Sequence, residues 1–477
     1  MAGPALEYAY RYRRPSELLT SRAGPLLALA TFRGLGEHPY FFEGRVARPR
    51  LTADLLRALM DVVRARFHIP AATLAKIVAA ADPVVTCNSD RLRFEAFSGC
   101  ASTYARVDFL PEAVETETFG RGTTNVDFHA PMIAALAKVR DRDRLSLAVG
   151  AKSVELKTND EAVVEKKVAL PVRWLKGFVE VQAYQPRLVP VHELAGVEAL
   201  RFLRGLPRMK TGKHAIHVVP AGRGLRLSQQ PAREGVKVGG LERLRVLERL
   251  APHAKSLRVY GDEDSGTSGW ELDLGVARFH LVLSPDVWRG FSGEGQVLSK
   301  LADKKWVAAL PKVQKALAWQ ATIDEEGLSR QTKLTPPQIR LALAALAARG
   351  LVGYDLATGA YFHRELPFDL SLVDQLQPRL VAAKKLLAAG GVKPLTPTRS
   401  TSEGQPTPTR SVSEGVPSSD TELEFLVAGS GVEHRVRLSA AGSRCTCPWY
   451  SKYQGQRGPC KHVLAVQMFA DNESPTE

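Results

Sequence analysis

The chain has 477 residues, of which 44% are hydrophobic, and carries a net charge of +15 with an isoelectric point near 9.6. A chain of this length can bury several hydrophobic cores, so we expect a globular protein of two to four domains. Five cysteines are too few for a disulfide framework, no stretch approaches the roughly 18 apolar residues of a membrane span, and residues 1–15 lack an apolar leader, which makes the cytoplasm the expected compartment.

The positive charge is concentrated in the middle of the chain. Residues 135–260 hold 25 Lys or Arg against 12 Asp or Glu, whereas residues 421–477 hold six of each. A basic surface attracts phosphate backbones because binding releases their counterions. The central segment is therefore a candidate for nonspecific nucleic-acid binding, although a solvated basic face or the docking of an acidic protein explains the same charge.

Residues 1–296 predict a basic α+β body that is divisible into two subdomains near residues 135–170. Apolar residues recur at helical spacing in four segments: Ala53–Phe67, Ala71–Ala81, Pro131–Val139 and Val197–Leu203. Strand patterns occur in nine segments: Arg91–Phe97, Tyr104–Phe109, Leu145–Val149, Ser153–Lys157, Val163–Ala169, Ala215–Val219, Leu257–Tyr260, Trp270–Leu274 and Arg278–Leu283. Short joins between many of them favour antiparallel sheets. Cys87 and Cys100 have no histidine near them in sequence, so we expect isolated, buried thiols.

Residues 297–390 predict a winged-helix-like module followed by a further helix. Helices are expected at Lys312–Gln320 and Glu325–Lys333, and Thr335, followed by two prolines, caps a third helix that ends at Gly350. Two strands follow, at Leu351–Tyr354 and Ala360–His363.

The third helix of this module offers few polar side chains for contacts with bases. They are Gln338, Arg340 and Arg349, among mostly alanine and leucine. Helices that read DNA usually present several Arg, Asn or Gln on one face. Sequence-specific reading is therefore not expected, and packing or protein contact explains the module equally well.

Residues 391–420 predict a disordered linker. The eleven residues 396–406 are repeated at 407–417 with two differences. Tracts rich in Pro, Ser and Thr cannot bury enough apolar surface to offset the loss of chain entropy. We expect a semi-extended tether that leaves the C-terminal segment free to reorient.

Four candidate metal ligands lie within eighteen positions after this linker. Cys445 and Cys447 are followed, after twelve residues, by Cys460 and His462. Residues i and i+2 of an extended segment share a face, and Pro459 opens a helix whose N-terminus favours a thiolate at Cys460. Three thiolates and one imidazole suit tetrahedral Zn²⁺ and leave no position for a reacting water, so we predict one structural zinc ion.

The Cys-x-Cys and Cys-x-His order, with Pro448 and Trp449 after the first pair, resembles the SWIM zinc finger. The resemblance implies a small ββα zinc unit, here residues 421–470, that binds DNA or protein. Its hairpin would comprise Glu424–Ala428 and His434–Leu438.

Two further segments extend this resemblance. SWIM fingers are found in bacterial helicase-like ATPases, in transposases and in free-standing bacterial proteins. Arg173–Phe178 and Trp288–Gly295 look like stretches of the free-standing proteins. The resemblance thus suggests a relation that extends beyond the finger.

Fragments that imitate catalytic signatures are incomplete. Lys210-Thr211-Gly212 matches one box of the serine penicillin-binding enzymes, but no Ser-x-x-Lys supplies a nucleophile. Neither a dinucleotide fingerprint nor a phosphate loop occurs. His214 and His217 lie in a strand pattern, where positions i and i+3 face opposite sides, which disfavours a metal pair. We therefore expect a protein that is not an enzyme.

We accordingly predict a zinc-binding protein that binds nucleic acid, DNA rather than RNA. The body would contact phosphates, and Lys452, Arg457 and Lys461 would add contacts near the metal. The competing hypothesis is a protein-interaction adaptor in a bacterial multiprotein complex. Its neutral finger would recognise a protein such as an ATPase, while the basic body docks an acidic partner. Neither hypothesis involves a membrane or a small-molecule substrate.

Overall fold

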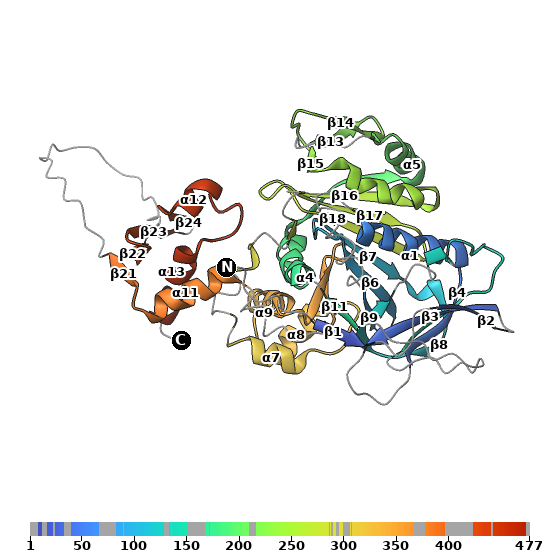
Figure 1. Ribbon diagram of the computed structural model, residues 1–477, viewed down its shortest axis with the longest axis horizontal. Helices are drawn as coiled ribbons and strands as arrows, with labels where there is room; N and C mark the ends of the chain where they lie inside the picture. The colour runs from blue at the N-terminus through green and yellow to red at the C-terminus, as the bar shows by residue number, and fades with distance from the viewer. Residues whose placement is uncertain are drawn as a thin grey trace, which may run out of the picture. The chain divides into compact units, whose positions relative to one another are not determined.

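The computed structural model describes residues 8–11, 17–21, 24–32, 40–65, 83–88, 90–127, 133–134, 136–150, 167–170, 172–208, 216–285, 287, 290–291, 295–298, 306, 308–366, 377–395, 423–439 and 442–473. The chain divides into two compact units: unit 1 comprises residues 1–294 and 306–373, and unit 2 comprises residues 295–305 and 374–477. Both combine helices with largely antiparallel sheets, which confirms the predicted α+β class (Figure 1). No helix in the described ranges is long and apolar enough to cross a bilayer. The four-part domain division stays a prediction.

A long sheet forms the centre of unit 1. In the described ranges it has 13 strands in the order β12-β16-β17-β18-β7-β6-β5-β9-β3-β10-β4-β8, with β2 beside β3. These pairs are antiparallel, except that β3 and β10 run parallel. The strands are β2 (Glu17–Ser21), β3 (Gly24–Phe32), β4 (Tyr40–Val46), β5 (Val84–Asn88), β6 (Arg91–Phe97), β7 (Thr103–Phe109), β8 (Val114–Phe119), β9 (Gly122–Asp127), β10 (Ser146–Gly150), β12 (Val189–Ala195), β16 (Ser256–Asp262), β17 (Thr267–Asp273) and β18 (Ala277–Leu283). A separate pair joins β1 (Tyr8–Arg11) to β11 (Lys167–Leu170).

Two helices of unit 1 pack against other elements through buried apolar side chains. α1 (Pro49–Arg64) has proline at its first position and packs on β6 and β7. α4 (Val172–Tyr184) buries Trp174 and Phe178, whose rings meet Phe97 edge to face with centroids 6.0 and 5.0 Å apart. A Cβ on Gly177 of α4 would lie 3.1 Å from the same ring, so a glycine there permits the close approach.

A smaller lobe of unit 1 consists of α5 (Gly196–Arg204) and a three-stranded sheet. The sheet has the order β14-β13-β15, with β13 at Ile216–Ala221, β14 at Gly224–Ser228 and β15 at Val236–Val238. β15 packs against β16 and β17 of the long sheet. β14 therefore lies at the outer edge (Figure 1).

Many of the elements expected in the body are present. The helices predicted at Ala53–Phe67 and Val197–Leu203 correspond to α1 and α5, and most of the predicted strands are found. The expected elements Ala71–Ala81 and Ser153–Lys157 lie outside the described residues, and Pro131–Val139 is described only in part. The sequence patterns missed α4 and several strands, including β5, β12 and β14.

The helices and hairpin expected between residues 297 and 365 are confirmed as individual elements. They are α7 (Leu310–Ala316), α8 (Glu325–Thr332), α9 (Pro336–Ala348), β19 (Val352–Asp355) and β20 (Ala360–His363). Thr335 is the N-cap of α9, as the Thr-Pro-Pro sequence predicted, and it also forms a capping box with Gln338. These elements share a core that includes Val313, Ile339 and Leu346. Their arrangement as a winged helix stays a prediction.

Buried charges join the β19–β20 hairpin to the long sheet. The Asp355 carboxylate lies 2.6 Å from a guanidinium nitrogen of Arg106 and 3.5 Å from one of Arg93. Arg106 also binds Asp108 at 2.8 Å, and all four side chains are at most 1% exposed. A second buried pair joins Arg364 to Glu95. The hairpin is thus held by ion pairs that water does not screen.

Unit 2 is a helix-and-sheet module. α11 (Pro378–Ala388) packs against α13 (Lys461–Glu473), which covers the sheet β21-β22-β23-β24. The strands are β21 (Val392–Leu395), β22 (Leu423–Ala428), β23 (Glu433–Ser439) and β24 (Gly442–Cys445), and α12 (Pro448–Tyr453) follows them.

The hairpin that the resemblance implied corresponds to β22 and β23. β21 was not expected: Val392–Leu395 lies in the stretch predicted as the start of the linker, but pairs with β22. The repeat at 396–417 lies outside the described residues.

Candidate metal centre

Three local elements bring the four predicted ligands together. Cys445 is the last residue of β24, and Cys447 caps the N-terminus of α12, which begins at Pro448. Cys460 directly precedes α13, and His462 lies in its first turn. One sulfur or ring-nitrogen atom from each ligand lies within 4.8 Å of the others, and all four side chains are buried. The strand-to-helix turn and the start of α13 thus converge on one point.

The backbone around the cluster supplies hydrogen-bond donors to the sulfur atoms. The Cys447 N–H donates to Cys445 Sγ at 3.5 Å, the Tyr450 N–H to Cys447 Sγ at 3.4 Å, and the Val463 N–H to Cys460 Sγ at 3.4 Å. Two of these donors are at helix N-termini, where peptide dipoles favour negative charge. The site is therefore built to hold thiolates.

The three sulfur atoms lie close enough to shift one another's pKa. The pKa of Cys447 is lowered because the thiols of Cys445 and Cys460 donate hydrogen bonds to its thiolate. The pKa of Cys445 is raised through the same bond to Cys447, and that of Cys460 is raised to about 11. Three adjacent thiolates repel one another, so full ionisation requires a positive ion among them.

The donor set fits one structural zinc ion. His462 Nδ1 lies 3.8 Å from Cys445 Sγ, so the Nδ1 side of the ring faces the sulfurs. Three sulfurs and one nitrogen would fill the four positions of a tetrahedral zinc ion, which would leave none for a substrate or a reacting water. The predicted ligands and cofactor are therefore confirmed as a cluster that suits zinc.

A second group of metal-ligating types in unit 1 does not make a comparable site. Asp108, His280 and Asp355 also lie within 4.8 Å of one another. Arg93 and Arg106 already neutralise both carboxylates, and they hold the pKa of Asp108 well below its ordinary value although burial alone would raise it. Two guanidinium groups at these oxygens would repel a metal ion.

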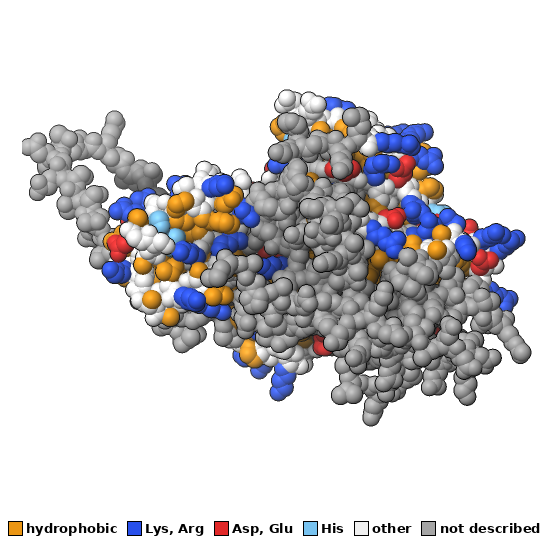
Figure 2. Space-filling model, viewed as in Figure 1, with side chains coloured by type: hydrophobic (Ala, Val, Ile, Leu, Met, Phe, Trp, Pro, Cys, Tyr) orange, Lys and Arg blue, Asp and Glu red, His pale blue; other side chains and the backbone are white. Residues whose placement is uncertain are grey.

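A cavity of about 440 Å³ lies beside the zinc ligands. Its lining comprises Arg379, Ser430, Val432, His434, Cys447, Pro448, Trp449, Cys460, Lys461 and His462. The Val432 side chain is 61% exposed, and the His434 ring lies 4.5 Å from that of His462. Figure 2 shows hydrophobic side chains on this unit bordered by Lys and Arg.

The three basic residues predicted near the metal differ in role. Lys452 is exposed, with its ammonium 5.4 Å from the Tyr453 ring, and Lys461 is half-buried at the cavity. Arg457 packs over Trp449 and Tyr453 at 4.9 and 4.6 Å. A fourth basic residue, Arg379 of α11, also lines the cavity and was not among those predicted.

Arg379 links α11 to the metal-binding loop. Its guanidinium lies 4.6 Å from the Trp449 ring and donates to the carbonyl oxygens of Arg457 and Pro459 at 2.8 and 2.9 Å. No local pattern identifies this residue, because it lies 66 positions before Cys445. Trp449 is therefore packed by cations from α11 and from the loop before α13.

The other candidate residues of the sequence are two cysteines and two short motifs, none of them among the four predicted ligands. Cys87 and Cys100 are free and buried, and burial raises the pKa of Cys87, as expected for unreactive thiols. Lys210-Thr211-Gly212 and His214 lie outside the described residues, and His217 is in β13.

A closed shell of three cysteines and one histidine on a strand-turn-helix scaffold defines a structural zinc-binding module. Residues 434–466 match the family model of the SWIM zinc finger, so the chain contains a SWIM zinc finger. No curated protein matches the chain. Among solved structures, proliferating cellular nuclear antigen from Entamoeba histolytica is similar at 11% identity and a TM-score of 0.32, over 52% of this chain and 99% of that one. A TM-score this low does not establish a shared fold.

The family match covers the finger only. Arg173–Phe178, which resembled a stretch of the free-standing bacterial proteins, begins α4 of unit 1. Of Trp288–Gly295, only Gly290, Phe291 and Gly295 are described. The wider resemblance therefore stays a prediction.

Proposed function

We propose that this protein binds nucleic acid without catalysing a reaction, through the zinc unit and the basic body. The observation that carries the proposal is the combination of cations, aromatic rings and an apolar cavity beside the zinc ligands. Phosphates pair with Lys and Arg, and bases pack on apolar and aromatic side chains. The closed zinc shell supports a structural rather than a catalytic role for the metal.

The charge of unit 2 supports this proposal more strongly than the finger sequence does. The finger segment 421–477 is neutral, but the described part of unit 2 also includes α11 and β21 and holds ten Lys or Arg against four Asp or Glu. Glu433 forms an ion pair with Lys393, and Glu424 forms ion pairs with Arg435 and Arg437. The three cations that pair with these acids lie on β21 and β23, whereas Lys461 at the cavity forms no ion pair within the described residues.

Salt dependence tests the proposal. Fluorescence anisotropy with labelled single-stranded and double-stranded DNA and RNA should give an affinity that falls steeply with salt, with a log-log slope of about −0.9 for each duplex phosphate neutralised. Lys461→Glu should weaken binding and reduce the magnitude of that slope. The substitution should not destabilise α13, because a negative side chain is favoured at the positive N-terminal end of a helix dipole.

Lys385→Glu is the matched control, because Lys385 is exposed on α11 and does not line the cavity. It changes the net charge by the same amount. Equal effects of the two substitutions would show that only overall charge matters. Absence of binding in dilute buffer would reject nucleic acid as the partner and leave the protein-interaction adaptor.

A further inference from the structure

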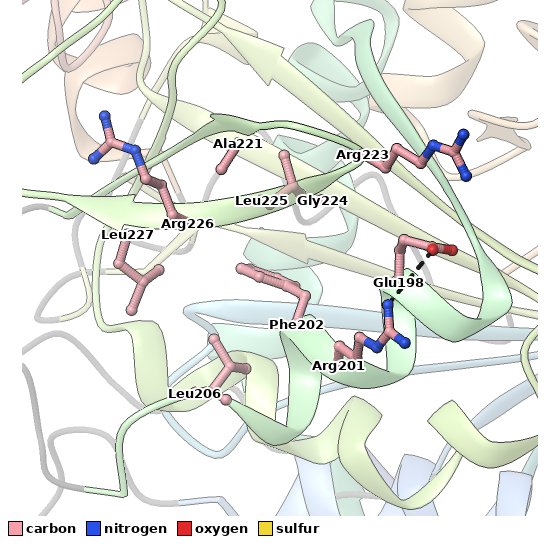
Figure 3. Close-up of a pocket in the computed structure, with 11 residues that line it drawn as sticks. Glu198, Arg201, Phe202, Leu206, Ala221, Arg223, Gly224, Leu225, Arg226 and Leu227 are labelled. Atoms are coloured by element: carbon pink, nitrogen blue, oxygen red, sulfur yellow. Dashed lines mark ion pairs between the residues drawn. The ribbon is translucent and has the colours of Figure 1, made fainter.

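A groove of about 540 Å³ separates α5 from the β13–β14 hairpin in the small lobe of unit 1 (Figure 3). Its lining comes from α5 and the residues just after it, and from the hairpin: Glu198, Arg201, Phe202, Gly205, Leu206, Ala221, Arg223, Gly224, Leu225, Arg226 and Leu227. The volume is typical of ligand pockets. Nothing in the zinc centre or its cavity involves these residues.

The strand beside the groove has an open edge. β14 pairs with β13, and no other described strand pairs with it. The connection is a two-residue turn, Gly222-Arg223, with Gly222 at φ +59°, as the first position of a type II′ turn requires. Such a turn closes on a hydrogen-bonded pair, here Ala221 with Gly224, and bonded and non-bonded pairs alternate from there.

This alternation directs specific backbone groups toward the open edge. Leu225 and Leu227 are opposite Pro220 and Val218 in the non-bonded positions, so their N–H and C=O groups point away from β13. Pro220 has no N–H to donate, which agrees with this register. Proteins usually cover or block such an edge, because it is a template for another strand.

The side chains along the groove are apolar on one face of β14 and basic on the other. Leu225 and Leu227 are half-buried and, being two residues apart, share one face. Phe202 and Leu206 complete the apolar floor, and the Phe202 ring stacks on Trp270 at 6.0 Å. Figure 3 shows Leu227 directed toward Phe202 and Leu206, and Arg226 directed to the opposite side of β14.

Basic side chains surround the groove. The described residues from 196 to 238 include seven Lys or Arg and only two acids, Glu198 and Glu234. Glu198 lies 3.9 Å from Arg201. Arg223 and Arg226 are exposed and form no ion pair within the described part of the chain. The lobe therefore complements an acidic ligand.

We propose that this groove binds an extended acidic segment of another protein, which adds to the edge of β14 as a further strand. Backbone groups of Leu225 and Leu227 bond to the segment. Its apolar side chains face Phe202, Leu206 and Leu227, and the alternate Asp or Glu side chains lie beside Arg226 and near Arg223. This function goes beyond nucleic-acid binding and does not depend on it.

The groove fits a peptide better than a nucleic-acid strand. Sequence-tolerant strand binding relies on exposed aromatic faces on which bases stack. Phe202 is the one aromatic residue in the described lining, is only 7% exposed, and already stacks on Trp270. An open strand edge, by contrast, offers paired donors and acceptors that match a peptide backbone.

The test uses the full-length protein and fluorescein-labelled octapeptides. A peptide of alternating Glu and Val should bind, whereas one of alternating Lys and Val should not. Two further Glu-Val peptides are compared, one N-methylated at every Val and the other at every Glu. Because alternate N–H groups of a strand point to the same edge, only one of these two isomers should lose binding. Binding should also slow amide hydrogen exchange in residues 224–228.

The double variant Arg223→Glu/Arg226→Glu should weaken the Glu-Val peptide by roughly tenfold or more. Arg204→Glu is the control on the same lobe, because Arg204 is exposed on α5 and does not line the groove. Equal loss from both isomers on N-methylation, no binding of the Glu-Val peptide, or unchanged binding by the double variant would each overturn the inference. If the double variant lost a labelled oligothymidine instead of the peptide, the groove would be a nucleic-acid site; nucleic-acid binding would then stand and this inference would fail.

Discussion

Removing the Asp355 carboxylate tests how the β19–β20 hairpin is held to the long sheet. In wild type, Asp355 pairs with Arg106 at 2.6 Å and with Arg93 and Arg91 at 3.5 Å each. Asp355→Ala leaves Arg93 and Arg106 with Asp108 as their remaining close carboxylate, and Arg91 with Asp90 at 3.9 Å. Removal of one partner from a buried ion pair costs about 3–5 kcal/mol, because the remaining charge stays buried.

The pKa of Asp355 gives a second measure of the same anchor. Burial alone would raise this pKa, but Arg106, assisted by His280 and Arg93, lowers it from 3.8 to about 2, against the repulsion of Asp108. That shift corresponds to about 2 kcal/mol of stability at neutral pH. Because the folded pKa is the lower one, the contribution is complete above about pH 4 and is lost as the pH falls toward about 2. Protonation of Asp355 should lower the stability less than Asp355→Ala does, because the protonated carboxyl group still fills its space.

Urea unfolding and hydrogen exchange measure the effect. Asp355→Ala should lower the free energy of unfolding of unit 1 by about 3 kcal/mol or more and accelerate exchange in residues 352–363. Asp264→Ala is the control: its side chain is 90% exposed and 3.4 Å from Arg187, so little change is expected. An Asp355→Ala protein within about 1 kcal/mol of wild type, with a protected hairpin, would refute the reasoning.

Further predictions concern the zinc unit and the buried thiols. Elemental analysis should find one zinc ion per chain, and Cys460→Ser should release it and unfold the finger while unit 1 still unfolds cooperatively; a variant that keeps its zinc would disprove the ligand set. Cobalt substitution should give the absorption spectrum of a tetrahedral, sulfur-rich site, not that of an open, water-bearing one. Gly458→Ala should lower the melting temperature of the zinc unit, because Gly458 has a φ of +73° and the new Cβ would lie 2.0 Å from the Gly295 carbonyl oxygen. Gly455→Ala is the control: Gly455 has a φ of +79° but open space around it, so this substitution should cost only the backbone strain of about 1 kcal/mol. Cys87 and Cys100 should resist a thiol reagent until the protein unfolds, and rapid labelling of the native protein would contradict their burial.

Features set by short segments were predicted well. The capping residue Thr335 and its two prolines located α9, and the Cys-x-Cys and Cys-x-His spacings located the metal cluster. Helix caps, turns and ligand spacing depend on neighbouring residues, so the local sequence carries the information. The hairpin β22–β23 was predicted from the resemblance to the SWIM zinc finger, and the structure confirms it.

Features that depend on distant partners were missed. β21 had the composition of a linker start, yet it is a strand because β22 offers it an edge. Arg379 was not associated with the finger, although it packs on Trp449 and bonds to the metal-binding loop. Apolar periodicity describes which face of a segment is buried, but not which segment covers it.

The sequence alone determined that this protein carries a zinc centre with four protein ligands, because those ligands lie within eighteen positions and their spacing matches the geometry of a strand end and a helix start. Only the tertiary structure decided that Asp355 meets Arg106 across 249 positions, and that one edge of β14, which no described strand covers, lies beside an apolar floor and exposed arginines. Strand order, register and long-range charge pairing arise from contacts between segments far apart in the chain, and such contacts leave no periodic trace in either segment.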